Sequence, residues 1–151
     1  MGVPEMFHVG IVVPDITTAQ ARLTELLDTR WGPIMEPEME WRDAHGAAHV
    51  TNHRISWSDG PPYIELIEER PGTLWECNEH SNLHHIGYYS GALTADSQHL
   101  TDARCPFQGT MGTGPEPAAF TYHRDPLGVR IELVDDSSRE GMRLLTGRRD
   151  D

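Results

Sequence analysis

The chain has 151 residues, the size of one compact domain with a core large enough to fold alone. Its 24 acidic and 12 basic residues give a formal net charge of -12, which would repel a nucleic-acid backbone and an anionic membrane surface. With no export signal and no apolar stretch of membrane-spanning length, the sequence predicts a soluble cytoplasmic protein without nucleic-acid or membrane partners. Cys77 and Cys105 are too few for a disulfide framework or a cysteine-rich metal site.

The first predicted element is a strand over residues 6–13, where aliphatic side chains dominate. Asp15 follows this run and can cap a helix that begins at about Ile16. The apolar residues of the helix fall on one face at helical spacing, so we expect the helix to pack on a sheet. These residues are Ile16, Ala19, Leu23, Leu26 and Leu27.

Two alternating runs complete the first half, after a stretch over residues 32–40 that is rich in proline and charge. Residues 49–57 and 63–68 alternate polar and apolar side chains, which predicts strands. The Ser-Asp-Gly-Pro-Pro sequence at residues 58–62 predicts a hairpin loop between them. The order of the first half is therefore a strand, a helix, and two or three strands.

The second half repeats that order. We expect a strand over residues 83–90, a short helix over 93–102, and strands near 118–123 and 129–135 with a turn between them. The tail from residue 137 onward is charged and is expected to be mobile, apart from a short helix around residues 142–145.

Histidine and glutamate recur at matching places in the two halves. His8 and His85 each precede an aliphatic residue and a glycine, within the sequences FHVG and HHIG. Glu65 and Glu132 each lie between an isoleucine and a leucine, within YIELI and RIELV. Two carboxylates that are buried close together need a cation or a proton nearby. We therefore predict that these four residues bind a metal ion.

The chain resembles the vicinal oxygen chelate superfamily, which includes glyoxalase I, methylmalonyl-CoA epimerase, extradiol dioxygenases and bleomycin-resistance proteins. The resemblance covers residues 6–135. It rests on HVGIVVPD at residues 8–15, LHHIG at 83–87 and DPLGVRIEL at 125–133.

This resemblance implies an α+β fold in which two βαβββ modules form a curled, barrel-like mixed sheet around a metal site. The modules would cover about residues 5–70 and 83–136 of a single domain, joined by a linker over about 71–82 and followed by the tail 137–151. Each module would give one ligand from its first strand and one from its last. A homodimer is expected because an open curled sheet leaves edges to cover.

The doublet His84-His85 offers two candidates for one ligand position. Side chains of a strand alternate between its faces, so only one of the two should point at the site. The match with FHVG selects His85. His84 is then expected on the other face, as a packed or solvated histidine.

Two nitrogen and two oxygen donors suit one divalent ion, namely nickel, cobalt, manganese, iron, zinc or magnesium, and leave two positions open. A small substrate with adjacent oxygens could take both positions, and the ion would stabilise the enolate formed by proton removal. The resemblance to glyoxalase I implies that a metal-bound glutamate moves the proton, with Glu132 the first choice and Glu65 the second. Candidate substrate-binding residues are Trp57, Tyr63, Tyr89, Tyr122 and Arg130.

The leading prediction is therefore a metal-dependent isomerase, epimerase or lyase that transfers a proton next to a carbonyl. The motif order looks more like methylmalonyl-CoA epimerase than glyoxalase I, although the acidic charge disfavours a CoA ester unless Arg54 or Arg130 compensates.

Two alternatives stay open. An iron(II) extradiol-type dioxygenase would use His8, His85 and Glu132, but Glu65 would occupy a position that oxygen needs. A non-catalytic protein that binds a small molecule or antibiotic, like the bleomycin-resistance branch, would not need the complete ligand set.

Two further patterns receive other interpretations. The histidines at positions 45, 49 and 53 have helical spacing, but they fall in a predicted turn and strand and are expected to be surface or lining residues. The glycine-rich residues 109–114 lack the ending of a phosphate-binding loop and predict a flexible loop near the pocket mouth.

Overall fold

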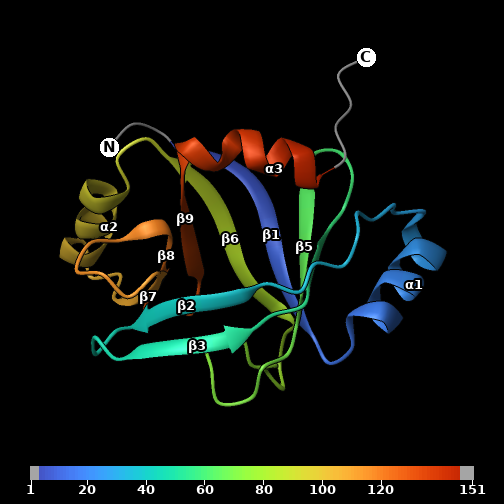
Figure 1. Ribbon diagram of the computed structural model, residues 1–151, viewed down its shortest axis with the longest axis horizontal. Helices are drawn as coiled ribbons and strands as arrows, with labels where there is room; N and C mark the ends of the chain where they lie inside the picture. Colours follow the sequence, from blue (N-terminus) through green and yellow to red (C-terminus); the bar gives the residue numbers. More distant parts are fainter. Residues whose placement is uncertain (1–3, 147–151) are drawn as a thin grey trace.

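One curled sheet organises the computed structural model, which describes residues 4–146 and contains nine strands in that range (Figure 1). The strands are β1 (Glu5–Val13), β2 (Glu38–Asp43), β3 (Ala48–Asn52), β4 (Ile55–Trp57), β5 (Tyr63–Glu68), β6 (Leu83–Ser90), β7 (Phe107–Met111), β8 (Ala118–Arg124) and β9 (Arg130–Asp135). The helices are α1 (Ile16–Leu27), α2 (Leu93–Asp102) and α3 (Arg139–Leu145), with a 3-10 turn η1 (Asp136–Ser138).

The strand order is β3-β2-β7-β8-β9-β6-β1-β5-β4. The first strands of the two halves, β1 and β6, pair antiparallel at the centre. Each also pairs in parallel with the last strand of its own half, β1 with β5 and β6 with β9. The predicted α+β fold with a curled mixed sheet is thus confirmed.

The predicted strand over residues 49–57 is divided in two. Its first part, β3, pairs with β2, whereas its second part, β4, pairs with β5 in the expected hairpin. The break falls at His53, whose backbone N–H leaves the ladder and donates to the carbonyl of Pro37 at 2.9 Å. In Figure 1 the β2–β3 hairpin crosses in front of the central strands. The β2–β3 hairpin therefore covers part of the central strands, and the sequence pattern did not predict this cover.

The first half of the glycine-rich segment differs from its prediction, whereas residues 112–114 lie outside the strands. Gly109 and Thr110 lie in β7, which pairs with both β2 and β8, so these residues are not part of a flexible loop. Thr110 is buried, and its hydroxyl donates to the carbonyl of Phe120 at 2.7 Å. The extended conformation of Gly109 and Thr110 depends on pairing with β2, which lies far away in the sequence. The local glycine content therefore could not predict it.

Helix α1 begins where it was predicted, and the Asp15 carboxylate accepts a hydrogen bond from the Thr18 N–H at 2.7 Å. Ile16 is fully buried against Val13 and Leu66. Leu26 and Leu27, which were expected on the packed face, are mostly exposed instead. They lie in the last turn, just before the left-handed C-cap at Asp28, where the helix has left the sheet.

The C-terminal region forms more structure than the sequence suggests. The predicted helix around residues 142–145 is longer in the structure, since α3 begins at Arg139. Met142 and Leu145 pack against the cluster of Phe7, Trp57 and Val134. Figure 1 shows α3 lying across one end of the central strands. The rest of the tail, residues 147–151, lies outside the described residues.

No helix in the described part of the chain is long and apolar enough to cross a membrane.

Two glycines allow the central strands to carry bulky rings on the same side. In the β1–β6 ladder, Gly10 lies opposite His85, and Gly87 lies opposite His8. A Cβ atom on Gly10 would overlap the His85 ring, and a Cβ atom on Gly87 would overlap the His8 ring. The glycine in each His-x-Gly sequence therefore makes room for the histidine of the other half.

Replacement of either glycine by alanine should destabilise the protein, because the overlap involves a ring held in the core. We expect Gly10→Ala and Gly87→Ala to lower the free energy of unfolding by about 1–3 kcal/mol, the usual cost of overpacking. Denaturant titration would measure it. Gly114→Ala is the control, since an added Cβ there meets nothing within 4 Å and its φ is not positive. Equal free energies of unfolding for all three variants would contradict the requirement for a glycine opposite each histidine ring.

Candidate metal centre

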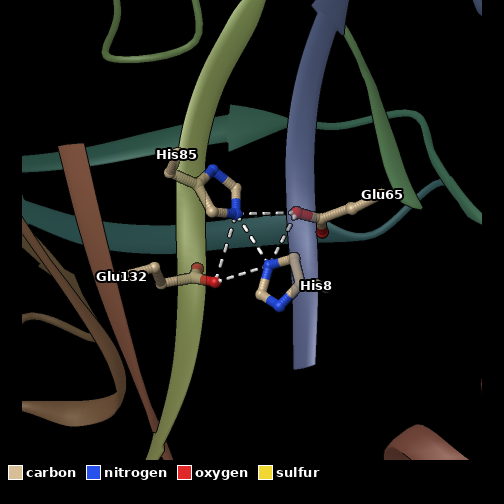
Figure 2. A group of neighbouring side chains, drawn as sticks. All are labelled: His8, Glu65, His85 and Glu132. Atoms are coloured by element: carbon tan, nitrogen blue, oxygen red, sulfur yellow. Dashed lines mark hydrogen bonds and ion pairs between the residues drawn. The ribbon is translucent and has the colours of Figure 1, made fainter. Parts of the chain in front are cut away.

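The four side chains selected from the repeat converge on one point (Figure 2). His8 comes from β1, Glu65 from β5, His85 from β6 and Glu132 from β9, so four adjacent strands supply one residue each. Their donor atoms all lie within 4.8 Å of one another. The structure therefore brings together the complete set of predicted ligands.

The pairing register explains this convergence. In the parallel ladders, Gly10 lies beside Glu65 and Gly87 lies beside Glu132. The same glycines face His85 and His8 across the central ladder. Each glycine thus has a histidine on one side and a glutamate on the other. Repeating the motif in antiparallel strands places all four side chains around a local two-fold axis.

The distances between donor atoms are those of a compact centre. His8 Nε2 lies 2.7 Å from His85 Nε2, 3.0 Å from a Glu132 oxygen and 3.8 Å from a Glu65 oxygen. His85 Nε2 lies 3.4 Å from the same Glu65 oxygen and 3.3 Å from the same Glu132 oxygen. Bonds to a divalent ion are about 2.0–2.2 Å long, so ligand atoms of one ion lie about 3–4.4 Å apart. Four of the five separations fall in this range, and the 2.7 Å between the two Nε2 atoms is shorter, so the four residues could hold a single divalent ion after a slight separation of the imidazoles.

Burial makes the charges in this centre strongly interdependent. Both histidine side chains are fully buried, and the glutamate side chains are about as enclosed, at 11% and 7% exposure. Burial alone would lower the pKa of His85, but the charges and hydrogen bonds of Glu132 and Glu65 raise it to about 9. Burial would raise the pKa of Glu132, whereas His85 and His8 hold it far below its usual range. Positive charge is therefore stabilised at this point, as a cation site requires.

His84 lies on the same side of β6 as His85, contrary to the expectation from strand alternation. The β1–β6 register slips by one residue between Gly10 and Ile11, which leaves His84 as the extra residue of a β-bulge. Both histidine rings pack against the ring of Tyr122, with ring centroids 5.5 Å apart for His84 and 5.2 Å apart for His85. Burial lowers the pKa of His84 well below its usual value. It is a packed histidine, as expected, but one that touches a predicted ligand.

A cavity of about 170 Å³ opens onto the centre, and His8, Glu65 and Glu132 form part of its wall. The rest of the lining is mainly apolar: Met39, Ile55, Trp57, Ile67, Trp75, Phe120, Tyr122, Val134, Met142 and Leu145. Helix α3 and the β2–β3 hairpin contribute to this lining together with the central strands. A small, largely apolar substrate with one polar end at the four ligands suits such a space.

Only part of the predicted substrate-binding set lines this cavity. Trp57 and Tyr122 do, but Tyr63 and Tyr89 border a separate hollow beside α3. There Tyr89 stacks on Phe7 with ring centroids 3.7 Å apart. Arg130 lies in a groove of about 670 Å³ formed with the loop after β5, and His85 contributes to that groove.

The cavity lining also includes His53, which was expected to be a surface or lining residue, and Trp75, which was not a candidate. His53 is 1% exposed, and its Nε2 has no hydrogen-bond partner among the described residues. Burial, with a smaller effect from Arg70, lowers its pKa to about 4, so the imidazole is neutral. Trp75 was assigned to the linker, yet it is buried in the core and its ring contacts His53 at 4.4 Å. The burial of this segment had one signal in the sequence, namely a tryptophan among polar residues.

The other two histidines of the spaced series lie elsewhere. His49 is near Asp43, with its Nε2 2.7 Å from a carboxylate oxygen, and His45 is exposed in the β2–β3 turn. Neither lines the cavity.

Known structures with the same fold include methylmalonyl-CoA epimerases. One, solved with methylmalonyl-CoA and NH4+, is 16% identical over 89% of this chain and 96% of that chain, with a TM-score of 0.61. A Streptomyces coelicolor methylmalonyl-CoA epimerase variant, solved with 2-nitronate-propionyl-CoA, is 16% identical over 89% and 95%, with a TM-score of 0.60. The Mycobacterium tuberculosis enzyme is 17% identical over 86% of each chain, with a TM-score of 0.52. At these identities the likeness concerns the fold.

Sequence comparison is informative at the level of the family. Among curated proteins, none matches the chain. A profile of the Glyoxalase/Bleomycin resistance protein/Dioxygenase superfamily matches residues 7–122, which include three of the four converging side chains. This match spans most of the chain and agrees with the curled mixed sheet, so the protein belongs to the glyoxalase/bleomycin resistance/dioxygenase superfamily, which has the vicinal oxygen chelate fold.

Proposed function

We propose that the protein is a divalent-metal-dependent enzyme that transfers a proton at the carbon next to a carbonyl, in a small substrate with adjacent oxygens. The observation that carries this proposal is the cluster of His8, Glu65, His85 and Glu132, of which all but His85 form part of the wall of an apolar cavity. A divalent ion bound there would supply Lewis-acid stabilisation of negative charge on the substrate oxygens. The four-ligand set supports this chemistry over oxygen activation, which needs more open positions.

The two glutamates differ in how firmly they are held. Glu132 lies 3.0 Å and 3.3 Å from the two imidazoles, whereas Glu65 lies 3.8 Å and 3.4 Å from them. The lowered pKa of Glu132, caused by His85 and His8 against the effect of burial, makes it a weak base. We therefore prefer Glu65 as the carboxylate that accepts the substrate proton and Glu132 as a fixed ligand. This order reverses the one suggested by the resemblance to glyoxalase I.

The apolar lining supports the same role. Trp57, Ile67 and Trp75 are all buried around the cavity, and they would exclude water from a carboxylate that has moved away from the centre. Glu65 lies at the wall of this space and could take a proton there.

Arg130 is our candidate for a negatively charged part of the substrate. Arg130 lies directly opposite Arg124 in the β8–β9 ladder. Neither arginine forms an ion pair with another residue in the range 4–146. The Nε of Arg130 donates to Gln108 at 2.7 Å, and burial and the charge of Arg124 lower the pKa of Arg130. An anion in this groove would relieve the repulsion. Arg54, the other expected cation, is already paired with Glu36 and Glu68.

Metal uptake provides the first test. The protein should bind about one divalent ion per chain, measured by elemental analysis after dialysis against nickel, cobalt, manganese, iron(II), zinc or magnesium in turn. His8→Ala and Glu65→Ala should each lose most of this ion because a ligand is removed, while the control His49→Ala should retain it. A native protein that takes up none of these ions would exclude the proposed centre.

Proton transfer can be detected without knowing the product. With methylmalonyl-CoA or a small 2-hydroxy ketone in deuterated water, the metal-loaded protein should exchange hydrogen at the carbon next to the carbonyl, as seen by NMR. Glu65→Gln should slow this exchange by about 10²–10⁴-fold, the usual contribution of a general base. Metal content measured on the same sample separates loss of the base from loss of the ion. Oxygen consumption with a catechol, without exchange, would favour the dioxygenase alternative.

The role of Arg130 predicts a selective loss of affinity for charged ligands. Arg130→Gln should weaken methylmalonyl-CoA binding by about 10- to 100-fold in calorimetry, because a charge-assisted hydrogen bond is lost. The control Arg22→Gln removes an equal charge from the surface of α1, where Arg22 pairs with Glu25. Equal effects of the two variants would indicate only a general influence of net charge.

A further inference from the structure

His84 connects the candidate metal centre to the backbone of the segment between the two halves. Its Nδ1 lies 2.9 Å from His85 Nδ1, and its Nε2 lies 2.7 Å from the carbonyl oxygen of Leu74. His84 is only 7% exposed, and its partner ring is fully buried. These two contacts use both nitrogens of His84 and the outer nitrogen of His85.

The direction of the hydrogen bonds follows from the chemistry of the last acceptor. A backbone carbonyl can only accept, so His84 Nε2 must carry the hydrogen that points to Leu74. In a neutral imidazole the other nitrogen is then an acceptor, and His84 Nδ1 must receive the hydrogen of His85 Nδ1. His85 must be neutral to bind a metal ion, and in that form its Nε2 carries the lone pair. This is the atom that faces His8, Glu65 and Glu132.

We propose that His84 is a positioning residue that fixes His85 as the Nδ1–H tautomer, so that its Nε2 is held ready as a metal ligand. This inference rests on the metal centre proposed above and concerns how one of its ligands is oriented. Partners of this kind fix the ring orientation of metal-binding histidines and increase their basicity.

The Leu74 carbonyl, which is the last acceptor in the series of hydrogen bonds from His85 through His84, lies in a defined turn. The Arg70 N–H donates to the Trp75 carbonyl at 2.7 Å, and the Trp75 N–H donates to the Thr73 hydroxyl oxygen at 3.1 Å. The buried Trp75 ring anchors the same turn in the core. The segment that joins the two halves therefore supplies a fixed acceptor for His84.

The two halves differ in this respect, despite their matched ligands. At the corresponding slip in the β1–β6 ladder, between Met6 and His8, the extra residue is Phe7. Its ring packs 4.3 Å from the His8 ring and offers no hydrogen-bond acceptor. His8 Nδ1 is buried and has no partner among the described residues. The second half thus holds its histidine by hydrogen bonds, and the first half holds it by packing alone.

Zinc affinity in matched variants tests this role. His84→Phe keeps a ring but removes the acceptor, and it should raise the zinc dissociation constant by about 10- to 100-fold. His84→Asn retains a side-chain oxygen that can accept from His85 Nδ1, and its affinity should return to within about threefold of the native value. The control His123→Phe removes a buried histidine that also uses both nitrogens, bonded to Ser97 and Cys105 behind the sheet.

NMR of the zinc-loaded protein with 15N-labelled histidine gives a readout that a merely structural role would not change. The native protein should show His85 protonated at Nδ1 and zinc-bound at Nε2, and His84 protonated at Nε2. The opposite His85 tautomer, or native zinc affinity in a folded His84→Phe protein, would overturn the inference while leaving the metal centre intact. Failure of the native protein to bind zinc or any of the other ions would instead remove the proposed function, and the inference with it.

Discussion

The close approach of β1 and β6 is the constraint on which the rest of the site depends. Two histidine rings lie on the same side of an antiparallel ladder, each directly across from a glycine. This is possible only because neither glycine has a side chain to meet the opposite ring. The arrangement directs both Nε2 atoms to one point, where the parallel neighbours β5 and β9 add a carboxylate each. One local motif, used twice, thus brings together four side chains that could hold a metal ion.

The surroundings of this centre are less symmetric than the centre itself. The β2–β3 hairpin and α3 close the cavity with apolar side chains, and Arg130 lies in a separate groove. His85 is hydrogen-bonded through His84, whereas His8 packs against Phe7. Glu132 is held more closely by both imidazoles than Glu65 is. The matched residues of the two halves therefore have unequal surroundings, and the proposed proton transfer uses this difference by assigning the less closely held carboxylate, Glu65, as the base.

Burial connects stability and chemistry in this fold. Two carboxylates and two imidazoles without solvent are tolerable only with compensating charge, and the raised pKa of His85 reflects that demand. A protein that served only as an apolar binding shell would have no need for such a costly cluster. The cluster and the cavity are therefore considered together in the proposed function, as a group of residues that could hold a cation beside a space for a substrate.

The sequence by itself determined the fold class, the two halves and the four converging residues, because His-x-Gly and Ile-Glu-Leu are local patterns that recur with the repeat. It failed where pairing between distant segments decides the outcome. The β2–β7 ladder includes residues 109–111 of the glycine-rich segment, and hairpin pairing divided residues 49–57. Tyr63 and Tyr89 line a separate hollow beside α3 instead of the cavity. A single inserted residue at His84 reversed the face of its side chain. Only the tertiary structure decides such points, because a β-bulge and a strand partner are set by contacts with residues remote in the chain, and periodicity within one strand does not record them.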